Sequence, residues 1–325
     1  MCKLNTRITE MLGIKYPIIC GGMLWLCKPE LCAAISNAGG LGNLTAGNYD
    51  SGEEFQAAVR RTKELTDKPF GVNISLLPSF RITEQTYDDY FRICCEEKVA
   101  AIEVSGSFAT KYLDMVKEAG VKIFHKVGAV RHAVKIEKLG YDGVFAAGFE
   151  EGGHPLSDDV TTMVLVPRMV ESVKIPVIAT GGIADGRGLA AALCLGAEGI
   201  MMASRFINTS ECQVHQNIKD ELIKRQENDT TLIGKSFNLQ GRALKNQLTS
   251  MILEKEAAGE SLQEVFPLMT GQRVKQAWHN GDVESAAFMV GQSIGLIKDI
   301  PTCDELLTGM VRDAEEILRH QLERF

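Results

Sequence analysis

The sequence lacks an excess of basic residues, a long apolar run and a paired-cysteine motif. Its 35 Lys and Arg against 42 Asp and Glu give a net charge of −7, which argues against non-specific nucleic-acid binding because such binding needs a basic surface. No stretch approaches the ~18–20 apolar residues of a spanning helix. Residues 1–19 lack the continuous apolar core of a signal peptide. We therefore expect a cytoplasmic protein with neither nucleic acid nor a membrane span.

Cysteine usage gives no sign of a metal site or of disulfides. The nine cysteines form an odd set, and none lies in the CxxC spacing that zinc sites commonly use. Free, buried thiols in a reducing compartment are the simplest interpretation. We expect no metal.

Short apolar runs, each followed by a helical pattern, repeat along the first two thirds of the chain. Every connection is long enough for a crossover helix, so the strands should be parallel. The chain's 325 residues suit one barrel plus an insertion. The expected strands are eight in number and cover residues 16–20, 41–45, 70–75, 100–105, 121–127, 143–147, 176–179 and 199–203.

The position of the glycine-rich turn decides between two parallel folds. A doubly wound Rossmann sheet places its glycine fingerprint after the first strand. Here Gly181-Gly182 follows the seventh strand, with the eighth close behind, which is where eight-unit barrels commonly hold phosphate. The sequence therefore predicts an α/β protein with a (β/α)8 TIM barrel.

The alternation of strands and helices stops near residue 209. Residues 212–227, 239–255 and 261–269 have helical patterns. We expect residues 1–209 to form the barrel and 210–282 a smaller, mostly helical substrate or cap domain inserted near the C-terminus. Residues 283–325 should form helices that pack back on the barrel.

The stretch 148–203 carries the features of an anion site. The turn after the seventh strand runs through Gly181 and Gly182 into a helix, so unpaired N–H groups and the helix dipole favour an anion. Asp185 argues against a bound phosphate there unless its carboxylate caps the helix. His154 lies in a glycine-rich loop after the sixth strand. A phosphorylated cofactor beside a titratable ring is the hypothesis that follows.

Residues at the carboxyl ends of barrel strands form active sites, and here they suit flavin mononucleotide (FMN). A flat ring needs bare backbone against it, polar contacts at its edge and a nearby cation. Asn73 and Lys126 can supply the edge contacts. The strand-end candidates for binding the cofactor are Gly22, Met23, Asn73, Lys126, Gly153, Thr180, Gly181, Gly182, Ala203 and Ser204.

Several of these residues have a plainer alternative role. Asn73 can cap a turn and Lys126 can be a surface lysine. His154 can exchange a proton with a substrate, or be a neutral loop histidine. Since neighbouring strand residues face opposite ways, only one of His125 and Lys126 can point into the barrel mouth.

Two further pairs of alternatives concern charged side chains near the strand ends. Arg205 can approach a phosphate or pair with an acid. Asp158 or Asp159 is expected to cap the helix that begins near residue 161.

The sequence resembles the nitronate monooxygenase family, formerly called 2-nitropropane dioxygenases. This family also holds NADH:quinone reductases and FMN-dependent enoyl-(acyl carrier protein) reductases. The resemblance runs nearly end to end and rests on several segments: TRITEMLGIKYPII with GGM, AAISNAGGLG, LTDKPFGVNISLLP, HKVGAVRHAVKIEKLGYDGV, GFEEGGHP, PVIATGGIADGRGLAAALCLGAEGI and GQSIGLI. Departures are Cys20, where many members have glutamine, and Ala203, where many have glycine.

The resemblance implies an FMN-bearing barrel in which His154 is the catalytic histidine. It also implies that FMN contacts the matching positions, which are Gly22, Met23, Asn73, Lys126, Gly153, Thr180, Gly182 and Ser204. Three functions stay open. The first is oxidation of NADH or NADPH with hydride transfer through FMN to a quinone, enone or enoyl acceptor. The second is oxidation of alkyl nitronates with O2, and the third is enoyl reduction on acyl carrier protein. The small-molecule acceptor, the choice of nicotinamide and a homodimeric state are left undecided.

Overall fold

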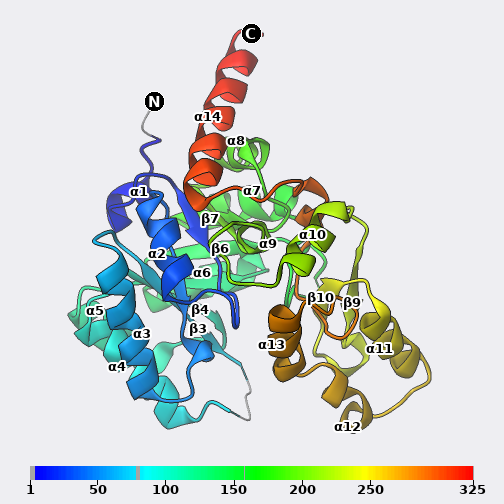
Figure 1. Cartoon of the computed structure of the whole chain (residues 1–325). Helices are drawn as coiled ribbons and strands as arrows, with labels where there is room; N and C mark the ends of the chain where they lie inside the picture. Colours follow the sequence, from blue (N-terminus) through cyan, green and yellow to red (C-terminus); the bar gives the residue numbers. More distant parts are fainter. Residues whose placement is uncertain (1–3, 78–80, 157, 325) are drawn as a thin grey trace.

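The computed structural model describes residues 4–77, 81–156 and 158–324, and it contains one sheet of eight parallel strands. The order in the sheet is β1-β8-β7-β6-β5-β4-β3-β2, and Figure 1 shows helices around it. The strands are β1 Ile18–Cys20, β2 Asn43–Thr45, β3 Gly71–Leu76, β4 Ala101–Gly106, β5 Lys122–Val127, β6 Gly143–Ala147, β7 Val177–Thr180 and β8 Gly199–Met202.

Backbone hydrogen bonds between β1 and the chain just before β2 close the sheet. Leu41 N donates to Ile18 O at 3.0 Å, and Cys20 N donates to Leu41 O at 2.9 Å. The ring of strands therefore has no free edge. The predicted eight-stranded parallel barrel is confirmed, and each strand lies within two residues of its expected bounds.

Helical segments follow each of the eight strands, as the sequence patterns predicted. Side-chain caps fix several of their starts, as Ser51 does for α3 and Thr83 for α4. The crossover segments are α2 Pro29–Asn37, η1 Ala46–Asn48, α3 Gly52–Leu65, α4 Glu84–Glu96, η2 Thr110–Tyr112, α5 Leu113–Glu118, α6 Val130–Leu139, α7 Thr162–Ser172, α8 Gly186–Cys194 and α9 Ser204–Ile207.

The barrel interior is apolar at one end and polar at the other. A buried cluster that includes Phe124, Phe145, Ile178 and Met201 fills the end nearer the strand starts. A short helix that the sequence patterns had not revealed, α1 Arg7–Leu12, packs against this cluster through Ile8 and Leu12. The polar side chains that follow on the same strands are therefore left to the open end.

Residues 210–282 contain strands as well as helices. They form α10 Gln216–Lys224, β9 Thr230–Ile233, η3 Lys235–Phe237, β10 Gly241–Leu244, α11 Gln247–Ala257, α12 Leu262–Val265, η4 Phe266–Leu268 and α13 Gly271–Asn280. β9 and β10 pair antiparallel, so the helix expected over 239–255 is wrong in its first part. Residues 230–244 form a two-stranded hairpin because Gly234 turns in the left-handed region and both strands bury β-branched or aliphatic residues. A small apolar cluster, including Ile233, Leu248 and Val265, holds this segment together.

The C-terminal stretch is helical only in part. Between residues 283 and 302, all of which the structure describes, only η5 Gln292–Leu296 is helical, so a longer helix expected there is wrong. α14 Cys303–Leu322 packs against α8 and α2, and Figure 1 shows it in red beside α8.

Neither a membrane helix nor a metal cluster is found within the described ranges. No helix there combines the length and apolar character needed to cross a bilayer. No group of three or more His, Cys, Asp or Glu side chains there could hold a metal ion. All the cysteines described are free, and of these Cys194 is exposed.

Two glycines allow the tight packing of the barrel to be tested. A Cβ on Gly42 would collide with the backbone carbonyl of Cys32, whereas a Cβ on Gly309 in α14 would meet nothing within 4 Å. Gly42→Ala is expected to lower the free energy of unfolding by roughly 2–3 kcal/mol. Gly309→Ala should raise it by about 0.5–1 kcal/mol because glycine weakens a helix. Urea unfolding measures both changes. Equal effects of the two substitutions would contradict the close packing of Gly42 against the Cys32 carbonyl.

Candidate active site

Three polar side chains project into the open end of the barrel from β3, β4 and β5. Register pairs Asn73 with Glu103, and alternation along β5 puts Lys126 on the same face as the interior residue Phe124. Asn73 and Glu103 are each 3% exposed, and the Lys126 side chain is 23% exposed. The structure thus brings Asn73, Glu103 and Lys126 to the same end of the barrel.

Glu103 is the hydrogen-bond acceptor at the centre of this cluster. Its Oε2 accepts from Gly22 N at 3.1 Å and from Asn43 Nδ2 at 3.3 Å. Burial raises the pKa of Glu103 to about 7, against the opposing effects of the Lys126 charge and the Gly22 and Asn73 hydrogen bonds. The carboxyl group therefore titrates near neutral pH and holds the first βα loop against the mouth.

Lys126 is flanked by a second carboxylate from the loop after β6. Its Nζ lies 3.2 Å from Glu151 Oε2, and Glu151 is 8% exposed. Burial alone would lower the pKa of Lys126, but the charges of Glu151 and Glu103 outweigh it and raise that pKa. The ammonium group is therefore kept charged at the mouth of the barrel.

His125 lies on the other side of β5, as alternation predicted. Its Nε2 lies 3.3 Å from Ser107 O, and its ring packs against Phe108 and Tyr141 with centroids 5.2 and 5.6 Å away. Burial lowers the pKa of His125, which favours the neutral ring. His125 supports the outer layer and does not face the mouth.

The turn after β7 is bare backbone in an unusual conformation. Gly181 and Gly182 have φ of +95° and +75°, which side chains rarely adopt. Across the part of the chain that the structure describes, no acceptor is bonded to either N–H group. The Thr180 and Gly181 carbonyls accept from Thr162 Oγ1 at 3.2 and 2.9 Å. The two free N–H groups give this turn the character of an anion site.

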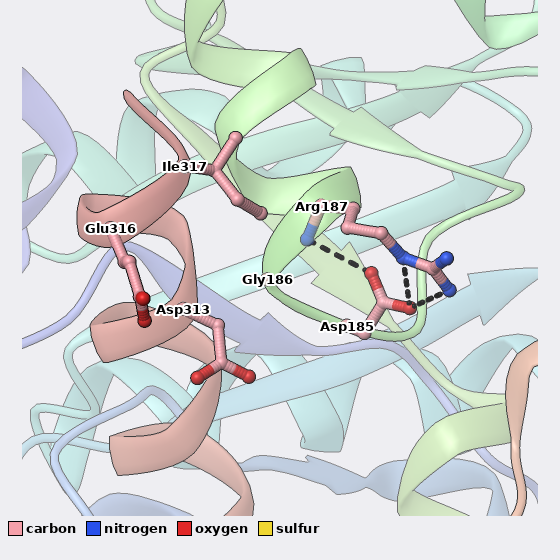
Figure 2. Close-up of a pocket in the computed structure, with 6 residues that line it drawn as sticks. All are labelled: Asp185, Gly186, Arg187, Asp313, Glu316 and Ile317. Atoms are coloured by element: carbon pink, nitrogen blue, oxygen red, sulfur yellow. Dashed lines mark hydrogen bonds and ion pairs between the residues drawn. The ribbon is translucent and has the colours of Figure 1, made fainter. Parts of the chain in front are cut away.

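Asp185 caps α8. Its carboxylate therefore does not argue against a phosphate at the glycine turn. Its Oδ1 accepts from Arg187 N at 2.9 Å and from Gly188 N at 3.3 Å, as Figure 2 shows in part. The hollow drawn there lies between α8 and α14 and is lined by three carboxylates against one guanidinium: Asp185, Asp313, Glu316 and Arg187, with Gly186 and Ile317. This hollow is too acidic for a phosphate and is separate from the strand-end cluster.

The residues after β8 join the C-terminal stretch to the barrel. Ser204 is buried, and its Oγ accepts from Gly291 N at 3.0 Å; Ala203 is half-buried beside it. Arg205 is 4% exposed and pairs with Asp299 at 2.5 Å. Of the two roles considered for Arg205, the structure supports the pairing with an acid.

The first βα loop presents Gly22 and Met23 to the mouth. Gly22 is exposed, and a Cβ there would collide with the Asn73 side chain. Met23 is buried, and its N–H donates to Thr45 Oγ1 at 3.1 Å. A side chain at Gly22 would therefore displace Asn73.

His154 is exposed, and within the described residues no hydrogen bond joins it to Glu103, Lys126 or Glu151. Its Nδ1 lies 2.9 Å from Gln240 O, at the start of β10. The neighbouring Gly153, with φ of +86°, forms a bridge to Arg242. The loop that carries His154 is thus paired with the β9–β10 hairpin.

The cap of α7 was predicted wrongly. Glu150, not Asp158 or Asp159, accepts from Thr162 N, at 3.0 Å, while Asp158 pairs with Arg131 at 2.5 Å. Because α7 begins one loop away from Glu150 in sequence, only the folded loop reveals the contact. Glu151 was likewise not among the expected site residues, although it lies in the loop just after β6.

Replacing Glu103 by Gln should change how stability depends on pH. The pKa of Glu103 is about 7 in the folded protein, above the ordinary value of 4.5. The proton bound to Glu103 therefore stabilises the fold fully below pH 4.5, and this stabilisation is lost as the pH rises through 7. The free energy of unfolding of Glu103→Gln minus that of the wild type should increase by about 3 kcal/mol between acidic and alkaline buffer. Urea titrations at several pH values measure it, with the exposed Glu118→Gln as control. A difference that does not vary with pH would contradict this assignment.

Comparison with known proteins gives agreement over nearly the whole chain. The family model described as Nitronate monooxygenase matches residues 5–123 and 78–313. The solved structure of FabK from Thermotoga maritima superposes with a TM-score of 0.92 at 37% identity, covering 99% of each chain.

Curated relatives match over similar lengths. One is the (3aS,4S,5R,7aS)-5-hydroxy-7a-methyl-1-oxo-octahydro-1H-indene-4-carboxyl-CoA dehydrogenase of Rhodococcus jostii, which is 32% identical over 97% of each chain. Another is a probable nitronate monooxygenase of Staphylococcus saprophyticus, 31% identical over 97% of this chain and 99% of its own. The protein is an oxidoreductase, and it belongs to the nitronate monooxygenase family.

Proposed function

We propose that this protein is an FMN-dependent reductase that takes electrons from NADH or NADPH and reduces an enoyl thioester. The observation that carries the proposal is the charged Lys126 at the end of β5, with the bare amides of Gly181 and Gly182 two strands away, after β7. Two relatives favour a thioester over other acceptors. FabK is an enoyl-(acyl carrier protein) reductase, and the dehydrogenase of Rhodococcus jostii acts on a CoA thioester.

The donor groups in the mouth fit FMN. The unpaired N–H groups of Gly181 and Gly182 suit a phosphate, with Ala203 and Ser204 on the neighbouring strand end. Gly22, Met23 and Asn73 would lie along the ring, together with Thr180, Gly153 and Lys126. When bound, FMN supplies hydride transfer between a nicotinamide and the acceptor.

Lys126 would provide a fixed positive charge where negative charge develops. The carboxylates of Glu103 and Glu151 keep the ammonium charged and hold it in place. A preoriented charge of this kind stabilises a developing anion without reorganising.

His154 would move the proton at the acceptor. The Gln240 carbonyl can only accept, so the Nδ1 of His154 carries a proton and Nε2 is left to face a substrate. An exposed imidazole with its hydrogen on Nδ1 can take up a proton from water at Nε2 and pass that proton to the substrate.

The segment 210–282 would form the substrate side of the mouth, next to the FMN barrel of residues 1–209. Gln240 contacts His154, and the Gly271 carbonyl in this segment accepts from Trp25 Nε1 at 3.0 Å. Trp25 belongs to the first βα loop. The segment therefore borders the mouth at two points, while residues 283–325 return to the barrel. Free cysteines suit a cytoplasmic enzyme.

Oxidation of alkyl nitronates with O2 is the second candidate. The family description and the relative from Staphylococcus saprophyticus favour it. In that reaction His154 would bind the nitronate, and no nicotinamide is needed.

Turnover with a small panel distinguishes the two functions. The purified protein, loaded with FMN, is given NADH or NADPH with crotonyl thioester or benzoquinone, and separately an alkyl nitronate under oxygen. The proposal requires nicotinamide oxidation that depends on the thioester. Oxygen uptake with the nitronate, without any nicotinamide oxidation, would replace it by the second function.

His154→Ala is expected to lower kcat by about 10²–10⁴-fold, which is the usual contribution of a positioned acid or base. FMN affinity, measured by quenching of flavin fluorescence, should stay near the wild-type value, since His154 is placed at the substrate. His320→Ala, on the exposed face of α14, is the matched control and should behave as wild type. Unchanged turnover in His154→Ala would remove the histidine from the reaction.

A further inference from the structure

Arg242 on β10 has a buried guanidinium group, and all the hydrogen-bond partners of this group are neutral. It is 4% exposed, and throughout the described ranges no carboxylate lies within 4.0 Å of it. A buried charge without an ion pair is costly and needs several hydrogen bonds to be retained. Its partners therefore indicate what the residue holds in place.

Most of these partners belong to the loop after β6. Arg242 Nη2 and Nε donate to Phe149 O at 3.1 and 3.3 Å, and the guanidinium carbon lies 4.8 Å from the centroid of the Phe149 ring. The remaining donor, Nη1, reaches Thr230 Oγ1 on β9 at 3.2 Å. The side chain thus links the hairpin to the first residues of the loop.

The backbone of Arg242 holds the other end of the same loop. Its N–H donates to Gly153 O at 2.6 Å, and Gly153 N donates to Arg242 O at 3.2 Å. Two residues earlier, the Gln240 carbonyl contacts His154 Nδ1, and Gln240 Nε2 donates to Pro155 O at 3.2 Å. One short stretch of β10 therefore fixes the loop from residue 149 to residue 155.

The loop 149–155 carries two side chains, Glu151 and His154, that the proposed reaction places at the barrel mouth. Glu151 lies between the two attachment points and reaches Lys126, and His154 follows directly. We propose that Arg242 is a positioning residue that sets the places of Glu151 and His154 by joining both ends of the 149–153 turn to the β9–β10 hairpin. The role assigned to His154 rests on the proposed function; the tethering of the loop does not.

Amide hydrogen exchange and kinetics on the full-length protein test this inference together. The variants are Arg242→Ala and the milder Arg242→Lys, which keeps the charge but loses the fork of donors. Arg225→Ala is the matched control, because Arg225 follows α10 in the same segment and pairs with Glu221 at 2.7 Å. Exchange is followed in peptides spanning 148–156, without any substrate, and kcat and KM are measured for the acceptor found active.

In Arg242→Ala, exchange at 149–155 should become about 10-fold faster or more as the loop opens locally. kcat should fall by about 10- to 100-fold with KM little changed, since small misplacements of a catalytic group cost this much. Arg242→Lys should lie between Arg242→Ala and the wild type, and Arg225→Ala should match the wild type in both measurements.

Two results would overturn the inference. One is wild-type exchange at 149–155 in both Arg242 variants. The other is an equal acceleration in Arg225→Ala, which would indicate general destabilisation. If the wild type turns over none of the acceptors, the proposed function fails, while the exchange measurement still decides whether Arg242 tethers the loop.

Discussion

The structure of the mouth depends on keeping one half-buried ammonium charged. Lys126 lies at the end of β5 with Glu151 at 3.2 Å and with the charge of Glu103 nearby. Burial by itself favours the neutral amine, and the charges of these two carboxylates outweigh it, so the pKa of Lys126 is raised. Since Glu103 also accepts from the Gly22 amide, the same interaction fixes the first βα loop. Three strands and two loops are thus linked around a single positive charge.

The loops of the last three strands are joined by backbone more than by side chains. Gly181 lies so close to the loop after β6 that a Cβ would be 2.9 Å from Gly148 O. Gln292 N donates to Glu150 O at 3.0 Å, and Gly291 N donates to Ser204 Oγ. Residues 291–292 therefore connect the ends of β6 and β8, and the glycines allow these approaches. The result is a rim with free amides in the turn after β7, two strands away from the charge on β5.

The barrel could be predicted from the sequence because its signals are local. Each strand is a short apolar run, each helix has its own periodicity, and some helices have a local side-chain cap, as with Ser51 and Thr83. The opposite orientations of His125 and Lys126 also followed from alternation alone. The cap by Asp185 could be anticipated because the acid immediately precedes its helix.

The features that were missed depend on contacts between distant residues. Residues 239–244 look helical in isolation, and pairing with β9 makes them a strand. Glu150 displaces Asp158 as the cap of α7 because the folded loop brings it there. Glu151 becomes a site residue only when the loop after β6 meets Lys126. Arg205 pairs with Asp299, which lies almost a hundred positions away in the chain.

A crystal structure of the complex with FMN would show whether the mouth of the barrel binds this cofactor. We expect the phosphate to accept hydrogen bonds from the amides of Gly181 and Gly182 and the ring to lie over Gly22 and Asn73, with Lys126 Nζ at its polar edge. A phosphate bound elsewhere, or a Lys126 that contacts only Glu103 and Glu151 and stays clear of the ring, would contradict this expectation.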